Sequence, residues 1–338
     1  MIRYPILQKG ATIGVTAPSS GVPVNLHHLL QLSCERMKQK GYQVICKDTA
    51  WQQHKAKSAP AVVRAREFQS MMTDDSIHLI FPPWGGELCI EMLEYLDFET
   101  LKDKWILGYS DTSVILLAVT LKNGLATAHG TNLIDLRGEY SDDTTSMWES
   151  LLAMKAGESF LQHSSQLYQK EWDFENPSPC VFHLTEPTSW KTVSQADVHI
   201  QGRLLGGCID VIRHLIGTPY GNVKHFQKRF IQDEPILWYF ENCELKTADL
   251  RRSLVQMKLA GWFDHCSGIL FGRSPANQPV QDYTAEDVYH DLSTELMLPI
   301  VYDIDCGHVP PQVTLINGSF AEVTVKQNKG TIRQSFLP

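Results

Sequence analysis

Short apolar runs alternate with longer amphipathic stretches along the first part of the chain. The apolar runs predict buried strands at 11–17, 43–46, 77–81 and 105–108. Apolar residues at helical spacing predict helices at 26–40, 61–72, 91–102 and 114–122. This alternation is typical of a doubly wound, mostly parallel sheet, which binds ligands beyond the carboxyl ends of its strands. Ser19, the Gly85-Gly86 turn and Ser110 all follow such strand ends.

The pattern weakens at 141–194 and then resumes. The weak stretch is rich in Ser, Trp, Glu and Pro, which predicts a linker and a mobile loop. Beyond it we expect strands at 198–205, 236–240, 267–271 and 299–304, and helices at 208–216, 247–260 and 284–295. The chain therefore divides into an N-terminal α/β domain (1–165), a linker with a substrate loop (166–195) and a C-terminal α/β domain (196–338).

The composition is that of a two-lobed globular protein. The chain has 338 residues, of which 43% are hydrophobic, so each lobe can bury a core. A formal net charge of -8 without a long Lys/Arg block argues against a nucleic-acid polymer or an anionic membrane as partner. Because the N-terminus has no sustained apolar stretch and the later apolar runs are short, we predict a cytoplasmic location.

Metal and disulfide chemistry receive no support from the spacing of potential ligands. The 8 cysteines include no C-x-x-C pair, and the chain contains no H-E-x-x-H motif. We therefore expect reduced thiols, no metal and no cofactor.

Ser110 occupies the position at which a nucleophilic serine is usually presented. It follows the strand predicted at 105–108 and precedes the helix predicted at 114–122. A tight strand-to-helix turn exposes the hydroxyl, and free N–H groups nearby can stabilise an oxyanion. The backbone N–H groups of Asp111 and of the Gly85-Gly86 turn are the candidates, since glycine permits close approach of a ligand. The alternative is that Ser110 or Asp111 only caps the helix.

A nucleophilic serine requires a base, and the base usually requires an orienting carboxylate. Glu241 follows an apolar strand, and His308 lies in a turn made rigid by the two prolines after it. A helix cap and an ordinary loop histidine are the alternatives for these two residues. His129 competes for the role of base, and Glu244 is the second choice for the carboxylate.

Three motifs resemble, in order, the signature segments of the S66 serine peptidases. They are Gly-Tyr-Ser-Asp-Thr-Ser at 108–113, Tyr-Phe-Glu-Asn-Cys-Glu at 239–244 and Asp-Cys-Gly-His at 305–308. The family contains the LD-carboxypeptidases and the MccF-like microcin C immunity carboxypeptidases. The resemblance extends to 14–20, 85–86 and 202–209, so it covers nearly the whole chain. It implies a flavodoxin-like or amidotransferase-like N-terminal sheet, a smaller C-terminal α/β lobe and a homodimer.

For the site, the resemblance implies a triad of Ser110 as nucleophile, His308 as base and Glu241 as orienting acid. Two positions depart from common patterns. Thr112 replaces the second glycine of G-x-S-x-G, which argues against an ordinary α/β-hydrolase. Cys208 stands where many LD-carboxypeptidases have Asn, which favours the MccF-like branch.

The substrate prediction depends mainly on Trp190. Its segment, 184–191, is similar to the extra loop that covers a nucleotide-bearing substrate in MccF-like enzymes. An exposed tryptophan could stack on a purine, which contributes roughly 1 to 3 kcal/mol, whereas the alternative is packing at the lobe interface. Arg203 and Lys246 are further candidates for binding a carboxylate or phosphate, with structural or surface roles as their alternatives.

We therefore predict a serine carboxypeptidase that cleaves the amide joining an aminoacyl group to a modified nucleotide, as in microcin C-type compounds. The first alternative is an LD-carboxypeptidase that removes the terminal D-Ala from murein tetrapeptide during cell-wall recycling. The second, from a different class, is a non-catalytic binding module on the same fold. Small molecules of these kinds, rather than macromolecules, are the expected partners.

Overall fold

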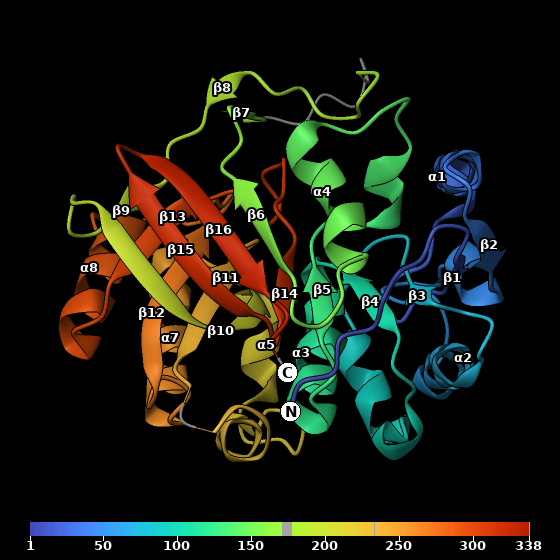
Figure 1. Cartoon of the computed structure of the whole chain (residues 1–338), viewed down its shortest axis with the longest axis horizontal. Helices are drawn as coiled ribbons and strands as arrows, with labels where there is room; N and C mark the ends of the chain where they lie inside the picture. The colour runs from blue at the N-terminus through green and yellow to red at the C-terminus, as the bar shows by residue number, and fades with distance from the viewer. Residues whose placement is uncertain (171–177, 233, 338) are drawn as a thin grey trace.

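A computed structural model describes residues 1–170, 178–232 and 234–337. It has two main β-sheets side by side with helices packed around them (Figure 1). The first has six strands in the order β14-β5-β4-β3-β1-β2, and the second has eight in the order β6-β16-β15-β10-β11-β12-β13-β9. A small sheet joins β7 (Leu167–Tyr168) to β8 (Glu186–Pro187). The predicted α/β fold with two lobes is confirmed.

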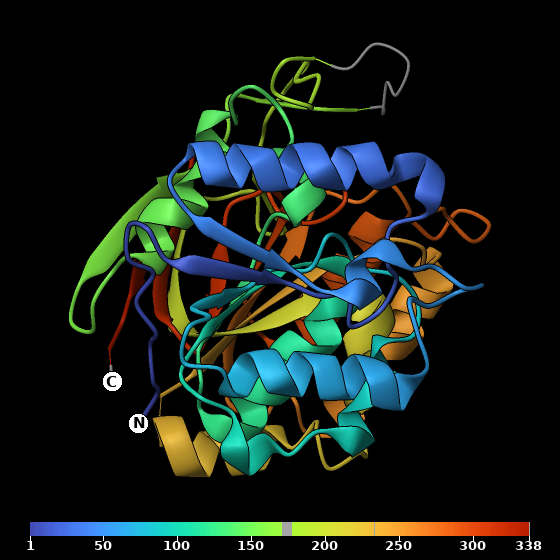
Figure 2. The ribbon, with the colours of Figure 1, turned by 90° about the vertical axis from the view of Figure 1, so that its right-hand side faces the viewer.

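The first sheet is parallel except at one edge. Its strands are β1 (Thr12–Val15), β2 (Gln43–Cys46), β3 (Leu79–Ile80), β4 (Trp105–Gly108), β5 (Thr127–His129) and the antiparallel β14 (Leu315–Asn317). Its helices are α1 (His27–Gln39), α2 (Ala61–Thr73), α3 (Ser113–Asn123) and α4 (Asp143–Leu152). Helices α1 and α2 lie on opposite sides of the sheet (Figure 2). Both faces are therefore covered, which explains why β1, β3, β4 and β5 are buried and why β3 and β4 are apolar throughout.

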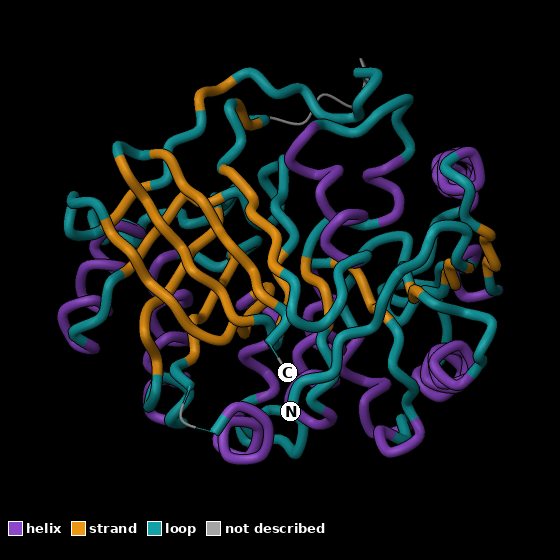
Figure 3. Tube along the Cα trace, in the orientation of Figure 1, coloured by secondary structure: helices purple, strands orange, loops and turns teal. Residues whose placement is uncertain are grey.

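The second sheet combines a parallel centre with antiparallel edges. Strands β10 (Val198–Cys208), β11 (Ile236–Glu241), β12 (Cys266–Gly272) and β13 (Ile300–Ile304) are parallel. Strands β6 (Ser159–His163), β9 (Lys191–Thr192), β15 (Phe320–Lys326) and β16 (Lys329–Ser335) pair antiparallel at its sides. Its helices are α5 (Ile209–Ile212), α6 (Val223–Phe226), α7 (Thr247–Leu259) and α8 (Ala285–Leu296). Figure 3 shows how strongly strands dominate this lobe.

Each sheet takes one strand from the other half of the chain. Strand β6 pairs with β16 in the second sheet, and β14 closes the edge of the first sheet beside β5. The chain therefore enters the second sheet at Ser159, before the domain border predicted at 165. One apolar core runs through both lobes, from Ile13 and Leu116 to Trp238 and Phe240. The lobes are thus packed as one unit.

Two predicted elements differ from the structure. In place of a helix at 91–102, the chain forms the 3-10 segments η3 (Cys89–Tyr95) and η4 (Phe98–Thr100). The Asp97 carboxylate accepts a hydrogen bond from the Glu99 N–H at 3.1 Å, and such a local bond starts a new turn instead of continuing a helix. The stretch at 141–194 contains helix α4, whose first N–H groups are capped by Asp142.

Shorter segments complete the path of the chain. They are η1 (Val24–Leu26), η2 (Asp48–Trp51), η5 (Ser110–Thr112), η6 (Leu133–Leu136), η7 (Arg213–Leu215) and a π-helical turn, η8 (Gln227–Ile231). The predicted mobile loop falls partly on 171–177, outside the described residues. Over 1–170, 178–232 and 234–337, no helix combines the length and apolar character needed to cross a membrane.

Candidate active site

Ser110 lies at a sharp strand-to-helix turn. Strand β4 ends at Gly108, Tyr109 is extended, and Ser110 begins η5, which leads into α3. The φ angle of Ser110 is 63°, a left-handed conformation that a non-glycine residue adopts only when its surroundings impose it. Because β4 and most of α3 are buried, the turn is held at both ends. The serine hydroxyl is thereby presented at the carboxyl edge of the first sheet.

His308 and Glu241 join Ser110 in one hydrogen-bonded chain. His308 Nε2 lies 3.1 Å from Ser110 Oγ, and His308 Nδ1 lies 2.8 Å from Glu241 Oε2. Ser110 comes from the first lobe, whereas Glu241 ends β11 and His308 follows β13 in the second. The sequence prediction therefore brought together three residues that the fold also brings together.

Gly307 allows His308 to approach the carboxylate. Its φ angle is +99°, and a Cβ atom at this position would lie 2.6 Å from both Cβ and Oε2 of Glu241. Glycine is the residue that meets both requirements without strain. The Tyr109 ring packs edge-on against the imidazole from the other side, with 5.0 Å between ring centroids. The orientation of the imidazole is thus fixed by packing as well as by hydrogen bonds.

Electrostatics favours an ion pair between His308 and Glu241. Burial alone would raise the pKa of Glu241, but the charge and hydrogen bond of His308 outweigh it and hold that pKa below its ordinary value. Burial alone would lower the pKa of His308, yet the Glu241 charge beside it raises that pKa well above the ordinary histidine value. Glu241 is fully buried and the His308 side chain is 21% exposed, so solvent screens the pair only weakly.

The two competing residues occupy other places. His129 is completely buried, and its Nδ1 lies 3.8 Å from the Cys306 sulfur. Burial lowers the pKa of His129 to about 4, which keeps the ring neutral. Glu244 is exposed, and its backbone N–H donates to Asp210. Neither residue is hydrogen-bonded to Ser110 or His308 within the described ranges.

The Gly85-Gly86 turn lies against the serine. A Cβ atom on Gly85 would be 2.6 Å from Ser110 Cβ and 2.9 Å from the Asp111 nitrogen. Gly86 has a φ angle of +139°, and a Cβ there would collide with Ser19 and Ser20. Within the described part of the chain, the N–H groups of Gly85 and Gly86 have no hydrogen-bond acceptor. These close approaches make the turn a suitable place for oxyanion donors.

Asp111 anchors the same turn through its side chain. Its Oδ2 accepts hydrogen bonds from Ser19 Oγ at 2.5 Å and from the Cys89 N–H at 2.7 Å. Burial raises the pKa of Asp111, although these hydrogen bonds counteract it. Ser19 Oγ also accepts from the Leu88 N–H at 3.2 Å. The residue after Ser110 is thereby tied to the segments that follow two neighbouring strands.

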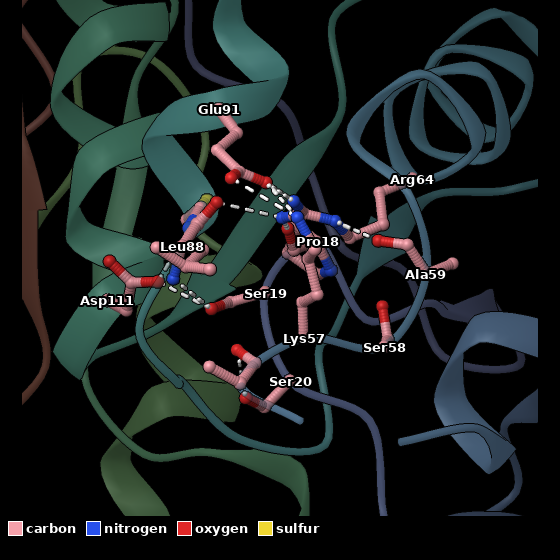
Figure 4. A network of polar contacts seen from close by, with 12 residues as sticks. Pro18, Ser19, Ser20, Lys57, Ser58, Ala59, Arg64, Leu88, Glu91 and Asp111 are labelled. Atoms are coloured by element: carbon pink, nitrogen blue, oxygen red, sulfur yellow. Dashed lines mark hydrogen bonds and ion pairs between the residues drawn. The ribbon is translucent and has the colours of Figure 1, made fainter. Parts of the chain in front are cut away.

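Arg64 of helix α2 extends this support in a way the sequence analysis missed (Figure 4). Its buried guanidinium donates to the carbonyl oxygens of Ala59, Pro18 and Leu88 at 2.6 to 2.9 Å. It also pairs with Glu91 at 2.6 Å. One side chain therefore joins the loops that carry Ser19 and the Gly85-Gly86 turn. The signal in the sequence was the position of Arg64, four residues before Phe68 and seven before Met71, which is the helical spacing of a buried face.

A pocket of about 390 Å³ opens above Ser110 and His308. It is lined by residues from several strand ends, namely Ser20, Gly21, Pro23, Gln53, Trp84, Gly85, Gly86, Tyr109 and Asn132. Trp84 is partly buried, and its indole N–H donates to the Gly21 carbonyl at 3.2 Å. Asn132 Oδ1 accepts from the Tyr109 N–H at 3.3 Å. The sequence analysis did not identify Trp84, Gln53 or Asn132, although each follows a predicted or observed strand end.

Two of the three predicted substrate-binding residues have structural roles instead. Trp190 is fully buried rather than exposed, and its Nε1 donates to Asp305 Oδ2 at 2.8 Å. It packs in an apolar cluster of the second lobe, so it cannot stack on a ligand. Arg203 is 1% exposed and donates to Glu234, to the Tyr4 hydroxyl and to the backbone carbonyls of Gly318 and Leu337.

Lys246 is exposed at the start of α7 and does not line the pocket above Ser110. A search of the described residues for groups of at least three His, Cys, Asp or Glu side chains able to hold a metal ion finds none.

The sequence matches two protein-family models. Residues 13–130 match the LD-carboxypeptidase N-terminal domain, and residues 201–323 match the LD-carboxypeptidase C-terminal domain, both of the S66 peptidases. The first match contains Ser110, and the second contains Glu241 and His308.

Relatives of two kinds align along nearly the whole chain. The microcin C7 self-immunity protein MccF of Escherichia coli is 23% identical over 340 residues, which cover 98% of this chain and 95% of MccF. The "Probable murein peptide carboxypeptidase" of Bacillus subtilis is 24% identical over 332 residues, which cover 96% of this chain and 92% of that protein.

Solved structures establish the similarity in fold. MccF in an inactive mutant apo state has a TM-score of 0.83 at 21% identity, with 100% of both chains covered. MccF in complex with aspartyl sulfamoyl adenosine gives 0.82 at 20% identity and the same coverage. Muramoyltetrapeptide carboxypeptidase from Oxalobacter formigenes gives 0.74 at 21% identity, with 97% and 100% covered.

Proposed function

The chain belongs to the S66 family of LD-carboxypeptidases, which are serine-type carboxypeptidases, and from this premise we propose that Ser110, His308 and Glu241 form its catalytic triad. The observation that carries the proposal is the continuous hydrogen-bonded chain, with 3.1 Å from Ser110 to His308 and 2.8 Å from His308 to Glu241. Nucleophile, base and orienting carboxylate in such a chain are what acyl transfer requires.

In the first half of the reaction, Ser110 Oγ attacks the carbonyl carbon of the scissile amide. His308 Nε2 takes the serine proton and then delivers it to the leaving nitrogen as the C–N bond breaks. In the neutral form of His308 that acts as base, Glu241 keeps the proton on Nδ1, so Nε2 can accept the serine proton, and Glu241 then stabilises the imidazolium that forms. In the second half, His308 removes a proton from water, the water oxygen attacks the acyl carbon, the ester bond to Ser110 breaks, and His308 returns the proton to Ser110 Oγ.

The negative charge on the substrate oxygen is stabilised by the backbone N–H groups of Asp111 and of the Gly85-Gly86 turn. Asp111 is the residue directly after the proposed nucleophile. A Cβ atom built on Gly85 would lie 2.9 Å from the Asp111 nitrogen, so the two segments are in close contact. One such donor typically contributes about 2.7 to 4 kcal/mol to lowering the barrier. The anchoring of Asp111 by Ser19 and Cys89 keeps the donor in place without reorganisation.

For the substrate we propose the amide between an aminoacyl group and a modified nucleotide. MccF, which aligns over 98% of this chain, has been solved with aspartyl sulfamoyl adenosine, and its fold is more similar to this one than that of the muramoyltetrapeptide enzyme. The partly buried Trp84 ring in the pocket above Ser110 offers an aromatic surface for a base, the role expected earlier of Trp190. A murein tetrapeptide is the second candidate, supported by the Bacillus subtilis relative.

The test is mass spectrometry of the products from aspartyl sulfamoyl adenosine and from murein tetrapeptide, each incubated with parent enzyme and with Ser110→Ala. We expect release of aspartate from the first substrate by the parent only. Release of D-Ala alone, lost in Ser110→Ala, would keep the triad and assign the murein substrate. Cleavage that persists in Ser110→Ala would refute the nucleophile, and no cleavage of either substrate by the parent would favour a binding module.

A further inference from the structure

A second pocket, of about 290 Å³, is lined by residues of both the β7–β8 region and the segment that follows His308. Val309, the residue after His308, lines it together with Tyr168, Lys170, Lys191, Arg273 and Asp303. We refer to it as the cationic pocket, because three of these side chains carry positive charge and one carries negative charge. This local excess of positive charge contrasts with the formal net charge of -8 of the whole chain.

Arg273 is fixed at the wall of the cationic pocket. It is 6% exposed, donates to Asp305 Oδ1 at 2.5 Å, and its guanidinium lies over the Tyr168 ring at 4.7 Å from the centroid. Its Nε is buried without a hydrogen-bond acceptor among the residues that the structure describes. A buried cation with an unused donor is costly unless another acceptor is supplied.

The acids near Arg273 are already occupied. Asp305 accepts hydrogen bonds from the Ser165 backbone N–H, the Ser165 hydroxyl and Trp190 Nε1 in addition to Arg273. A carboxylate shared by four donors has little capacity left to balance further charge.

The lysines leave an excess of positive charge at the mouth of the pocket. Lys191 pairs with Asp303 at 2.9 Å and lies over the Tyr302 ring. Lys170 is exposed and has no acidic partner among the described side chains. Among the described residues, Lys191 is balanced by Asp303 and Arg273 by Asp305, which leaves the charge of Lys170 without an acidic partner there. The pocket therefore has the charge, the donors and the volume for an anionic group larger than a water molecule.

We propose that the cationic pocket is a subsite for a carboxylate or phosphate on the part of the substrate remote from the scissile bond. The inference rests on the proposed function, because it assumes an amide bound at Ser110. His308 lines the pocket above Ser110 and the next residue, Val309, lines the cationic pocket, so the two pockets border adjacent residues of one segment. The preferred substrates of this chain are accordingly amides with a second, anionic end.

The experiment uses matched substrates that differ only at the remote end. One pair is a tetrapeptide with a free side-chain carboxylate and its carboxamide, and the other is an aminoacyl sulfamoyl nucleoside with and without a phosphate on the ribose. We measure kcat/KM with the parent and with the double variant Lys170→Met/Lys191→Met. These lysines are exposed or half-exposed, so the fold is expected to survive their replacement. The preference of the parent for the anionic member of at least one pair should fall about tenfold in the double variant.

Lys102→Met is the control, because Lys102 is 44% exposed and paired with Asp75, just as Lys191 is 44% exposed and paired with Asp303. The subsite would be overturned by any of three results. The parent could lack the preference, the double variant could keep it, or the control could lose it. The pair that shows the preference identifies carboxylate or phosphate as the ligand. Calorimetric binding of inorganic phosphate and of a dicarboxylic acid to parent and double variant tests the subsite even if the parent hydrolyses none of these amides.

Discussion

Replacing Gly85 by alanine adds a single methyl group at the place where the turn meets the nucleophile. The new Cβ would lie 2.6 Å from Ser110 Cβ, 2.8 Å from Ser110 Oγ and 2.9 Å from the Asp111 nitrogen. Gly85 does not have a positive φ angle, so its backbone conformation is open to alanine. The substitution therefore perturbs the site through space, with little strain in the backbone itself.

The magnitude follows from these distances. The 2.6 Å approach is about 0.8 Å short of the 3.4 Å at which ordinary contact begins, so the turn and Ser110 have to separate by nearly that amount. A misplacement of about 1 Å at reacting groups costs about 100-fold in rate. Loss of one oxyanion donor costs about 2.7 to 4 kcal/mol, or about 100- to 1000-fold. We therefore expect kcat/KM to fall by about 100- to 1000-fold, mainly through kcat.

The assay is steady-state hydrolysis of whichever substrate the parent cleaves, together with thermal unfolding of the variant. Gly41→Ala is the control, because it is the same substitution at a position where no atom lies within 4 Å of the new Cβ. The control should keep parental activity even though its φ of +96° imposes backbone strain. A folded Gly85→Ala enzyme with kcat/KM within a factor of about three of the parent would refute the placement of the oxyanion donors.

Three further outcomes are expected. In Glu241→Gln, kcat should fall by about 10⁴, as for an orienting carboxylate replaced by its amide, and the acid limb of the pH profile should move to lower pH. The acid limb moves to lower pH because Glu241 raises the pKa of His308, and activity appears as His308 loses its proton. An acid limb that stays in place would contradict the ion pair. Arg64→Met leaves buried carbonyls without a donor, at about 1 to 3 kcal/mol each, so the melting temperature and kcat should both fall with KM little changed. Trp190→Phe removes the hydrogen bond to Asp305 and should lower the free energy of unfolding by about 1 to 3 kcal/mol, while the ratio of kcat/KM for nucleotide and peptide substrates stays as in the parent. A selective loss with the nucleotide substrate would restore the stacking role that burial contradicts.

The residues that the sequence predicted best are those fixed by local chemistry. The strand predicted at 105–108 and the helix after it were found with nearly the same bounds, because an apolar run and a helical period depend only on near neighbours. The grouping of Ser110 with Glu241 and His308 came from motifs in the order of a known family. Those motifs identify the residues that meet, but their spacing along the chain does not reveal the strand pairing that brings them together.

The predictions that failed depended on distant partners. Trp190 lies in a segment that looks like a surface loop, but Asp305, 115 residues away, accepts its indole N–H and holds it inside. The 11-residue strand β10 and its antiparallel neighbours arise from pairing over long separations, which no local period records. Whether the chain forms the predicted homodimer, and where it resides in the cell, stay predictions.

The strand that β14 contributes to the first sheet has a consequence for the order of events during synthesis. The ribosome releases Ser110 long before it releases Leu315–Asn317, yet the latter close the edge beside β5. The first lobe therefore emerges with a bare sheet edge, a surface prone to pairing with other chains. His308 and the closing strand leave the tunnel almost together, so Ser110 meets its proposed base only when its own lobe can be closed. On the proposed triad, the nascent chain is therefore expected to stay inactive until translation is nearly finished.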